Sequence, residues 1–315
     1  MASLINAVVF PGQGSQYLSM LEDYFLNEPT FKEIFETSSK VIDIDLIQLI
    51  NSKEEENISR TEVTQPLMLV ANVALWKLIA PKLKNISFLA GHSLGEYAAL
   101  VAAEALEFEN ALELVKSRSR LMQNAVPEKE GAIAAIIGLK EETVLDICRR
   151  VTTSPSKLVN TANINSPNQI VISGTATGVE EAIIMCKKEG AKRAIKLKMS
   201  VPAHSELMLS ASKEFAQVIE QVTFYDPAIP VIHNVDVSIS KTAKQIKEKL
   251  IEQLFKPVKW SDTIKLMIEK GGVNNIIECG PAKVLSGLIK RIDPKVTTID
   301  LDNYNHYLEL KNANK

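Results

Sequence analysis

The sequence predicts an α/β protein: a mostly parallel sheet covered by helices on both faces, with a smaller domain inserted into the chain. Short apolar segments alternate with longer amphipathic ones, which is typical of parallel strands connected by helices. Between Pro127 and Pro202, the expected elements follow the order β-α-β-β-α-β. With 315 residues, 46% of them hydrophobic, the chain is long enough to bury a core in both parts.

A short strand and a glycine-rich turn open the chain. Residues 6–10 are apolar, and Gly12 and Gly14 in the turn at 11–16 permit close approach of the backbone. These glycines could also begin a dinucleotide-binding fingerprint. Tyr17 stands where that fingerprint requires its third glycine, which argues against a nucleotide site.

The next elements are mainly helical. Leu67, Val70, Ala74 and Leu78 share one helical face after Pro66, which predicts a core helix with proline in its first turn. The other elements of this part are a helix at 31–50, a solvated charged turn at 53–56, a strand at 86–90, and helices at 96–106 and 109–123.

The inserted domain has the element order of a ferredoxin-like fold. We place it at residues 129–202 and assign residues 1–128 and 203–315 to the larger domain. Its expected elements are strand 132–137, helix 141–151, strands 158–163 and 170–173, helix 179–189 and strand 194–198.

Alternating helices and short apolar strands complete the larger domain and its parallel sheet. We find no internal repeat and no low-complexity tract. The expected elements are helices at 205–221, 241–255, 261–270 and 282–291, and strands at 231–235, 275–278 and 296–301.

Composition narrows the class of partner. A formal net charge of −2 gives no reason to expect nucleic acid. Three widely spaced cysteines without a C-x-x-C pair fit a reducing cytoplasm. The longest apolar run, 66–80, is interrupted by Asn72 and Lys77, and the amino terminus lacks a basic region. We therefore expect a cytoplasmic protein with neither signal peptide nor membrane span, and we take a monomer as the default.

A Gly-x-Ser-x-Gly sequence, Gly91 to Gly95, predicts the nucleophile. It lies between an apolar strand and a helical segment, where a sharp turn exposes the serine and the following helix directs its N–H groups toward the hydroxyl. The two glycines leave room for the turn because they lack a Cβ. The alternative is a chance match, but the flanking elements favour Ser93 as a nucleophile.

A serine nucleophile needs a base within hydrogen-bond reach, and the chain has four histidines. His92 is adjacent to the nucleophile at a tight turn and points elsewhere. His306 lies in a polar tail, and His233 follows an apolar pair, as a core histidine would. His204 lies where the small domain returns to the large one, and we favour it because active-site clefts form between domains.

Nearly the whole chain also resembles a known family, malonyl-CoA:acyl carrier protein transacylase. The resemblance extends in order from residue 8 to residue 288 and implies an α/β-hydrolase-like large domain with an inserted ferredoxin-like small domain. The matching segments are VFPGQGSQ, TQPLMLVANVAL, GHSLGEYAALVA, NINSPNQIVISG, SVPAH, PVKW and ECGPAKVLSGL.

The resemblance implies a role for each matching residue. Ser93 becomes the acyl-accepting nucleophile, His204 its general base, and Arg118 the partner of the free carboxylate of malonate. Arginine suits that role because its planar guanidinium binds a carboxylate through two parallel bonds and keeps its charge when buried. Arg118 lies between Lys116 and Arg120 on one helix, so a plain surface role is the alternative.

The resemblance also implies an oxyanion hole made by the backbone N–H groups of Gln13 and Leu94, each such donor contributing about 3 kcal/mol to transition-state stabilisation. Gln253 matches the glutamine whose main-chain carbonyl orients the histidine. From the residues alone, Asp226 or Glu278 could instead complete a triad.

Two asparagines match a loop of the small domain that faces the cleft. These are Asn163 and Asn165, although asparagines near a proline are often simple turn formers.

The implied reaction is malonyl transfer from malonyl-CoA to holo acyl carrier protein through a seryl acyl-enzyme, which supplies fatty acid biosynthesis without a metal or cofactor. A thioesterase built on the same dyad is one alternative, and it would have no use for a buried Arg118. A non-catalytic module that docks carrier proteins is another, and the intact nucleophile and base argue against it. Lys192, Arg193, Lys196 and Lys198 could meet an acidic carrier protein or form an ordinary solvated strand edge.

Overall fold

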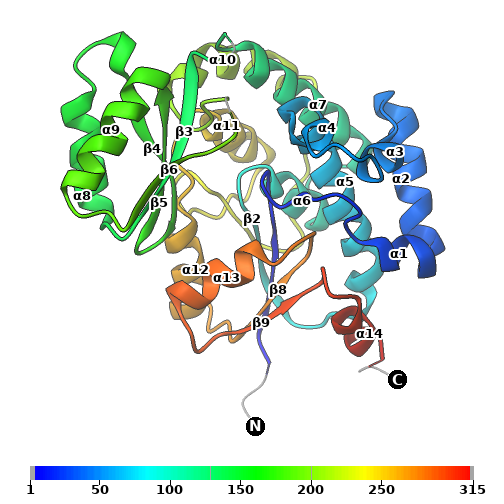
Figure 1. Ribbon diagram of the computed structural model, residues 1–315. Coiled ribbons are helices and arrows are strands. Elements are labelled where there is room, and N and C mark those ends of the chain that lie inside the picture. The colour runs from blue at the N-terminus through cyan, green and yellow to red at the C-terminus, as the bar shows by residue number, and fades with distance from the viewer. Residues whose placement is uncertain (1–3, 128, 200, 313–315) are drawn as a thin grey trace.

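A computed structural model describes residues 4–127, 129–199 and 201–312. The larger domain is built on a five-stranded sheet with the order β7-β2-β1-β8-β9, in which all neighbouring strands are parallel. Figure 1 shows this sheet below the centre of the molecule, with β1 in its middle. Its strands are β1 (Asn6–Phe10), β2 (Ile86–Gly91), β7 (Val231–Ile232), β8 (Asn275–Glu278) and β9 (Thr297–Asp300).

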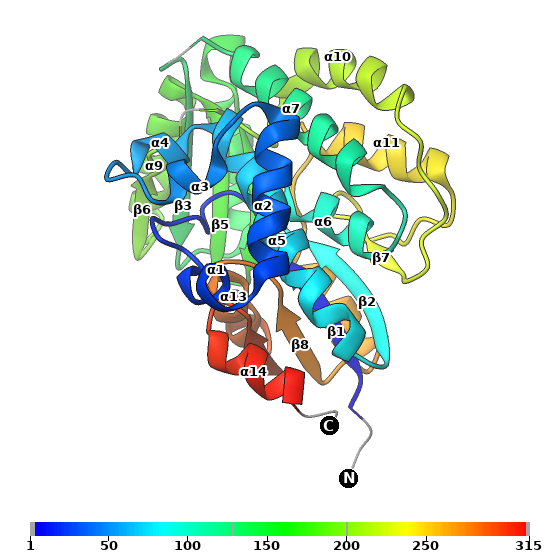
Figure 2. The same cartoon turned by 90° about the vertical axis from the view of Figure 1, so that its right-hand side faces the viewer.

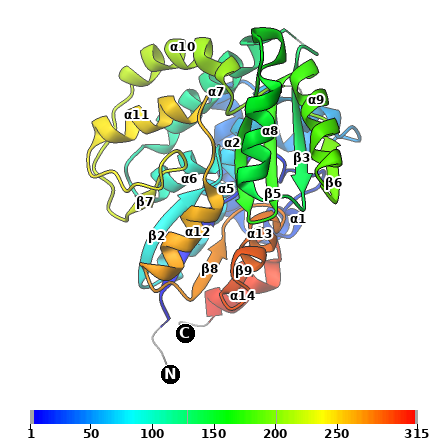
Figure 3. The ribbon, with the colours of Figure 1, turned by 90° about the vertical axis from the view of Figure 1, so that its left-hand side faces the viewer.

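Alternation along β1 explains why helices cover both faces of this sheet. Val8 and Phe10 belong to one apolar cluster and Ala7 and Val9 to another, because successive side chains of a strand point to opposite faces. Figures 2 and 3 show the two helical layers from opposite sides. One layer contains α2 (Pro29–Ile42), α5 (Thr61–Ile79), α6 (Gly95–Ala102) and α7 (Phe108–Asn124), and the other contains α12 (Trp260–Glu269) and α13 (Val284–Ile292).

The inserted domain has its own antiparallel sheet with the order β4-β5-β3-β6. Its apolar core lies between this sheet and two helices (Figure 1). The elements are β3 (Gly131–Ile137), α8 (Glu141–Val151), β4 (Val159–Ser166), β5 (Gln169–Thr175), α9 (Ala176–Lys188) and β6 (Arg193–Lys196). The predicted fold class, a parallel α/β sheet with a β-α-β-β-α-β insertion, is therefore confirmed.

The remaining helices complete the larger domain. Figures 1 and 2 place α10 at the end of the molecule opposite α14. These helices are α1 (Glu22–Asn27), α3 (Leu46–Ile50), α4 (Glu56–Ser59), α10 (Leu209–Glu220), α11 (Ala243–Gln253) and α14 (Tyr304–Asn312). Short 3₁₀ segments occur at Ala80–Lys82, Pro155–Lys157 and Glu206–Met208.

Local backbone geometry corrects three predicted helices. The helix expected at 31–50 is two helices, because Asp43 ends α2 with a left-handed φ of 56°. The helix expected at 96–106 ends at Ala102, and Glu104 follows with a φ of 60°. Pro66 is not in the first turn of its helix: α5 starts at Thr61, so the proline lies in the helix interior.

Three polar segments also differ from the prediction. The charged turn expected at 53–56 runs into α4, and the polar tail around His306 forms α14. Strand β4 extends past its predicted end at residue 163 to Ser166, so Asn163 and Asn165 both lie in this strand rather than in the loop that the resemblance implies. Polar composition did not reveal these elements because tertiary contacts, not apolar periodicity, stabilise them.

Helix α5, with 19 residues, is the longest helix in the described part of the larger domain. By length and composition alone, residues 61–82 could cross a membrane, but 72% of the most apolar window is buried inside the protein. Leu67, Val70 and Ala74 are fully buried in the main core. Residues 64–75 are buried without a break, so α5 packs at the centre of the domain on all its faces and not on the single apolar face predicted.

Hydrogen bonds join the two domains beside the sharp turn that follows β2. The backbone of Ile164 in β4 donates to the carbonyl of Val258 at 2.9 Å, and Val258 donates to the carbonyl of Ala162 at 2.9 Å. The side chains of His92 and Asn165 add a contact of 2.8 Å between Nε2 and Oδ1. The cleft between the domains is thus held at its base by the strand that contains both predicted asparagines.

Candidate active site

Ser93 lies on the sharp turn between β2 and α6. Its backbone is left-handed, with a φ of 50°, and an added Cβ on Gly91 would overlap the backbone of Gly95. Asn234 braces the turn, since its Oδ1 accepts from the Ser93 N–H at 2.7 Å and its Nδ2 donates to the Gly91 carbonyl at 2.7 Å. The Gly-x-Ser-x-Gly sequence therefore forms the sharp strand-to-helix elbow that it predicts, with Ser93 half-buried at its tip.

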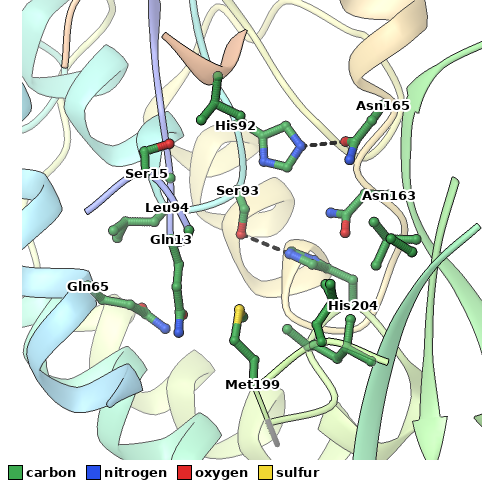
Figure 4. A pocket seen from close by; sticks show the side chains of 18 of the residues that line it. Gln13, Ser15, Gln65, His92, Ser93, Leu94, Asn163, Asn165, Met199 and His204 are labelled. Carbon is green, nitrogen blue, oxygen red and sulfur yellow. Dashed lines mark hydrogen bonds between the residues drawn. The ribbon is translucent and has the colours of Figure 1, made fainter. Parts of the chain in front are cut away.

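A cavity of about 410 Å³ opens above the elbow, between the two domains. Figure 4 shows Gln13, Leu94 and Ser93 on one side of it and Asn163 and His204 on the other. The small domain contributes apolar side chains to its wall, namely Ile133, Val171, Leu197 and Met199.

His204 meets the nucleophile in this cavity. Its Nε2 lies 2.8 Å from Ser93 Oγ, and its Nδ1 lies 2.7 Å from the main-chain carbonyl of Gln253 (Figure 4 shows the first contact). Because a carbonyl only accepts, Nδ1 carries the proton and Nε2 is free to accept from the serine hydroxyl. Burial, and then the positive charge of Arg118, lower the pKa of His204 to about 3.

The other histidines occupy different environments. His233 is buried and contacts Glu96, with 2.7 Å between Nδ1 and Oε1, as a satisfied core histidine would. His92 bonds to Asn165, and His306 Nδ1 contacts the carbonyl of Asp300 on the far side of the sheet. The geometry therefore supports His204 as the partner of the serine.

Neither acidic candidate reaches His204. Glu278 is buried, and its two oxygens accept from the backbone N–H groups of Leu285 and Ser286 at 2.9 and 2.7 Å. Asp226 is exposed on a loop. The arrangement is a serine–histidine pair oriented by a main-chain carbonyl, as the resemblance implies.

Arg118 extends from α7 into the base of the cavity and is 1% exposed. One terminal nitrogen donates to Gln65 Oε1 at 2.6 Å, and the other to Gln253 Oε1 at 2.9 Å. The second nitrogen also lies 3.5 Å from Ser93 Oγ. A surface role for Arg118 is excluded by this burial, and the guanidinium stands beside the nucleophile.

Gln13 and Leu94 also line the cavity beside the serine. Leu94 precedes the first turn of α6, so its N–H has no helical carbonyl to bond. Gly12 lies so close to the elbow that an added Cβ would overlap the His92 carbonyl, and the neighbouring Gln13 is among the residues that line the same cavity. The Asn72 side chain holds this loop by donating to the Pro11 carbonyl at 2.8 Å. The loop and the elbow thus form a pocket suited to an oxyanion.

Sequence reasoning missed three polar residues that organise the site: Gln65, Glu96 and Asn234. They come from separate helices and loops, and each is at most 1% exposed. Buried polar side chains in apolar surroundings are the one signal that could have identified them, since such groups need hydrogen-bond partners. Asn163 and Asn165 line the cavity as expected, whereas Ser200 of the SVPAH segment lies outside the described residues.

The lowered pKa of His204 predicts how the reactivity of Ser93 depends on pH. We expect acetylation of Ser93 by p-nitrophenyl acetate to keep its rate between pH 8 and pH 5, because His204 stays unprotonated there. Intact-mass detection of acetyl-enzyme at short times measures that rate. An inflection of the rate near pH 6.5, the ordinary pKa of histidine, would contradict the lowered pKa of His204.

The same shift has a consequence for stability. An unfolded chain protonates histidine near pH 6.5, whereas folded His204 resists protonation down to about pH 3. The unfolded state therefore binds more protons in this window. As a result, the free energy of unfolding decreases as the pH falls from 6.5 toward 3.

Within the described residues, no cluster of three or more His, Cys, Asp or Glu side chains is arranged to hold a metal ion. The polar groups around Ser93 are the hydroxyl, imidazole, guanidinium and amide groups described above. The arrangement is suited to acyl transfer through a serine ester.

Comparison with known proteins agrees with this chemistry. Residues 7–292 match the family described as acyl transferase domain. The malonyl CoA-acyl carrier protein transacylase of Haemophilus influenzae is 42% identical over 300 residues, which cover 94% of this chain and 95% of that protein. The protein of the same name from Escherichia coli K12 is 41% identical over 297 residues, covering 94% and 95%.

Solved structures are equally similar. The malonyl CoA-acyl carrier protein transacylase of Coxiella burnetii superposes with a TM-score of 0.93 at 43% identity, covering 97% of this chain and 96% of that one. A malonyl-transacylase in complex with a type II PKS acyl-carrier protein superposes with a TM-score of 0.94 at 42% identity, covering 97% and 98%. The serine elbow, the cavity and these matches lead to one conclusion: the chain belongs to the malonyl CoA-acyl carrier protein transacylase family.

Proposed function

We propose that this protein transfers the malonyl group of malonyl-CoA to the phosphopantetheine thiol of holo acyl carrier protein and thereby supplies fatty acid synthesis. The position of Arg118 carries the proposal. One terminal nitrogen of its guanidinium lies 3.5 Å from Ser93 Oγ. At that distance it can bind a carboxylate that is separated from the acyl carbonyl on Ser93 by a single methylene. A short diacid attached to Ser93 would place its free carboxylate against this cation.

In the first half-reaction, His204 Nε2 takes the hydroxyl proton while Ser93 Oγ attacks the thioester carbonyl. The backbone N–H groups of Gln13 and Leu94 stabilise the resulting oxyanion. Collapse breaks the C–S bond, and the departing coenzyme A thiolate takes the proton from His204. The Gln253 carbonyl holds the imidazole in the required tautomer throughout.

In the second half-reaction, the carrier-protein thiol gives its proton to His204 and its sulfur attacks the ester carbonyl. The same two N–H groups stabilise the oxyanion. The Ser93–acyl bond then breaks, and Ser93 Oγ recovers its proton from His204. Both half-reactions use one cavity in turn, which makes the kinetic mechanism ping-pong.

Arg118 is the feature that favours transfer of malonyl over hydrolysis of simple acyl chains. A buried guanidinium without a carboxylate partner is costly, so a hydrolase for neutral acyl groups would gain nothing from it. A module that only docks carrier proteins would need neither the 2.8 Å contact between Ser93 and His204 nor the oxyanion loop.

The protein acts as a cytoplasmic monomer without a metal or bound cofactor. Its domain division is 1–128 with 203–315, and 129–202, which follows the two sheets, although residue 128 itself lies outside the described residues.

Intact-mass spectrometry tests the function directly. The protein is mixed separately with malonyl-CoA and acetyl-CoA, and its mass is read before and after addition of holo acyl carrier protein. We expect a malonyl adduct that persists in buffer and disappears when the carrier protein gains the same mass. Equal loading of acetyl would overturn the substrate assignment, and rapid loss of the adduct without a thiol would indicate a hydrolase.

A further inference from the structure

Glu96 is a fully buried carboxylate three residues after the nucleophile, on the first turn of α6. Its Oε1 lies 2.7 Å from His233 Nδ1. Its Oε2 accepts from the Asn234 backbone N–H at 3.1 Å and from Gln253 Nε2 at 2.7 Å. Three donors from two distant segments therefore converge on one carboxylate, whose desolvation they offset.

The contact with Glu96 fixes the orientation of the Gln253 side-chain amide. Its Nε2 donates both to Glu96 and to the Ser93 carbonyl, the latter at 3.1 Å. Its Oε1 must then face Arg118, from which it accepts at 2.9 Å. The flipped amide would set its oxygen against the carboxylate and its NH₂ against the guanidinium, both unfavourable contacts.

Gln253 joins two parts of the site. Its main-chain carbonyl accepts from His204 Nδ1, and its side-chain carbonyl accepts from Arg118. Arg118 makes no direct ion pair within the described part of the chain, and the negative charge of Glu96 acts on it across the Gln253 amide. A change at Glu96 therefore reaches both the base and the arginine through a single residue.

We propose that Glu96 is a positioning residue: through Gln253, it sets the orientation of both His204 and Arg118. The proposal rests on the malonyl transfer proposed above only for the role of Arg118. It predicts unequal effects on two acyl donors. A malonyl donor depends on both arms of Gln253, whereas a neutral ester such as p-nitrophenyl acetate depends on the His204 arm alone.

The central experiment compares Glu96→Ala in the native background and in a Gln253→Met background. We expect Glu96→Ala to lower kcat/KM for malonyl-CoA by about 30-fold, within the range for a hydrogen bond to a charged group, and acetylation of Ser93 by p-nitrophenyl acetate several-fold less. In the Gln253→Met background, the same change should lower malonyl loading less than about threefold, because the connecting amide is already absent.

Two matched variants complete the set. Glu113→Gln makes the same chemical change as Glu96→Gln, but on an exposed face of α7, and it should leave both rates unchanged. Glu96→Gln keeps an oxygen that can accept from Asn234 and Gln253, and its NH₂ can donate to the other tautomer of His233. We therefore expect it to retain at least a third of the native rate for malonyl-CoA.

Three results would overturn the positioning role. They are an equal fall for both acyl donors after Glu96→Ala, an equal effect of that variant in both backgrounds, and a tenfold or larger loss in folded Glu96→Gln. If Glu96→Ala does not fold, the comparison of Glu96→Gln with the native protein is sufficient to test the positioning role. Failure of the native protein to load malonyl would refute the proposed function instead, and acetylation of Ser93 would still show whether Glu96 acts on His204.

Discussion

Replacing Ser93 by alanine is expected to abolish the malonyl adduct and to lower transfer to the carrier protein by at least about 10⁴-fold. The hydroxyl is the atom that His204 contacts at 2.8 Å and that Arg118 approaches at 3.5 Å. Without it, the remaining oxyanion donors have no ester to stabilise. Intact mass and a carrier-protein acylation assay measure the two quantities.

The same variant separates catalysis from docking. Ser93→Ala removes only the hydroxyl oxygen and leaves the elbow, the cavity and the exposed surface in place. A module that only docks carrier proteins would therefore keep its cellular role in this variant. Complementation of a strain that lacks its own transacylase shows whether the protein acts as an enzyme or as a docking module. Growth supported by Ser93→Ala would refute the enzymatic function.

Replacing Arg118 by alanine is expected to lower kcat/KM for malonyl-CoA by roughly 10²–10³-fold, because the carboxylate would lose a buried charge partner. Loading of acetyl should change far less, so the preference for malonyl should largely disappear. Arg118→Lys should have a kcat/KM for malonyl-CoA between those of the native protein and Arg118→Ala, since an ammonium keeps the charge but not the planar pair of donors. Competition between the two acyl-CoA donors, read by intact mass, measures the preference.

Arg120 supplies the matched control for this change. It lies two residues further along α7 and is exposed, so Arg120→Ala alters the charge of the same helix without touching the cavity. It should load malonyl at the native rate. An Arg118→Ala protein that still selects malonyl would show that another group recognises the carboxylate.

Much of the fold was predictable because apolar periodicity reports burial directly. The parallel strands β1 and β8 and the helix α8 match their predicted bounds. The errors arose where a single backbone angle decides the outcome. Asp43 and Glu104 end helices through left-handed conformations, and no pattern of apolar residues encodes that choice.

The site was predictable only in part. The elbow around Ser93 is a local pattern, and His204 was favoured by its place between the two domains. The arginine and glutamine partners followed from a family resemblance. Glu96, Gln65 and Asn234 had no such signal, because their importance depends on contacts between positions up to 157 residues apart, as for Gln253 and Glu96. Contacts of that separation exist only after the chain has folded.

Ser93 and His204 share one further property: both have left-handed backbones, with φ of 50° and 60°. Such a conformation costs a non-glycine residue roughly 1 kcal/mol. Glycine would relieve the strain but remove the hydroxyl or the imidazole. Folding and chemistry thus make opposite demands at the same two Cα atoms. The chain therefore holds both reactive side chains on strained backbone, and this local strain is part of what the active site costs the fold.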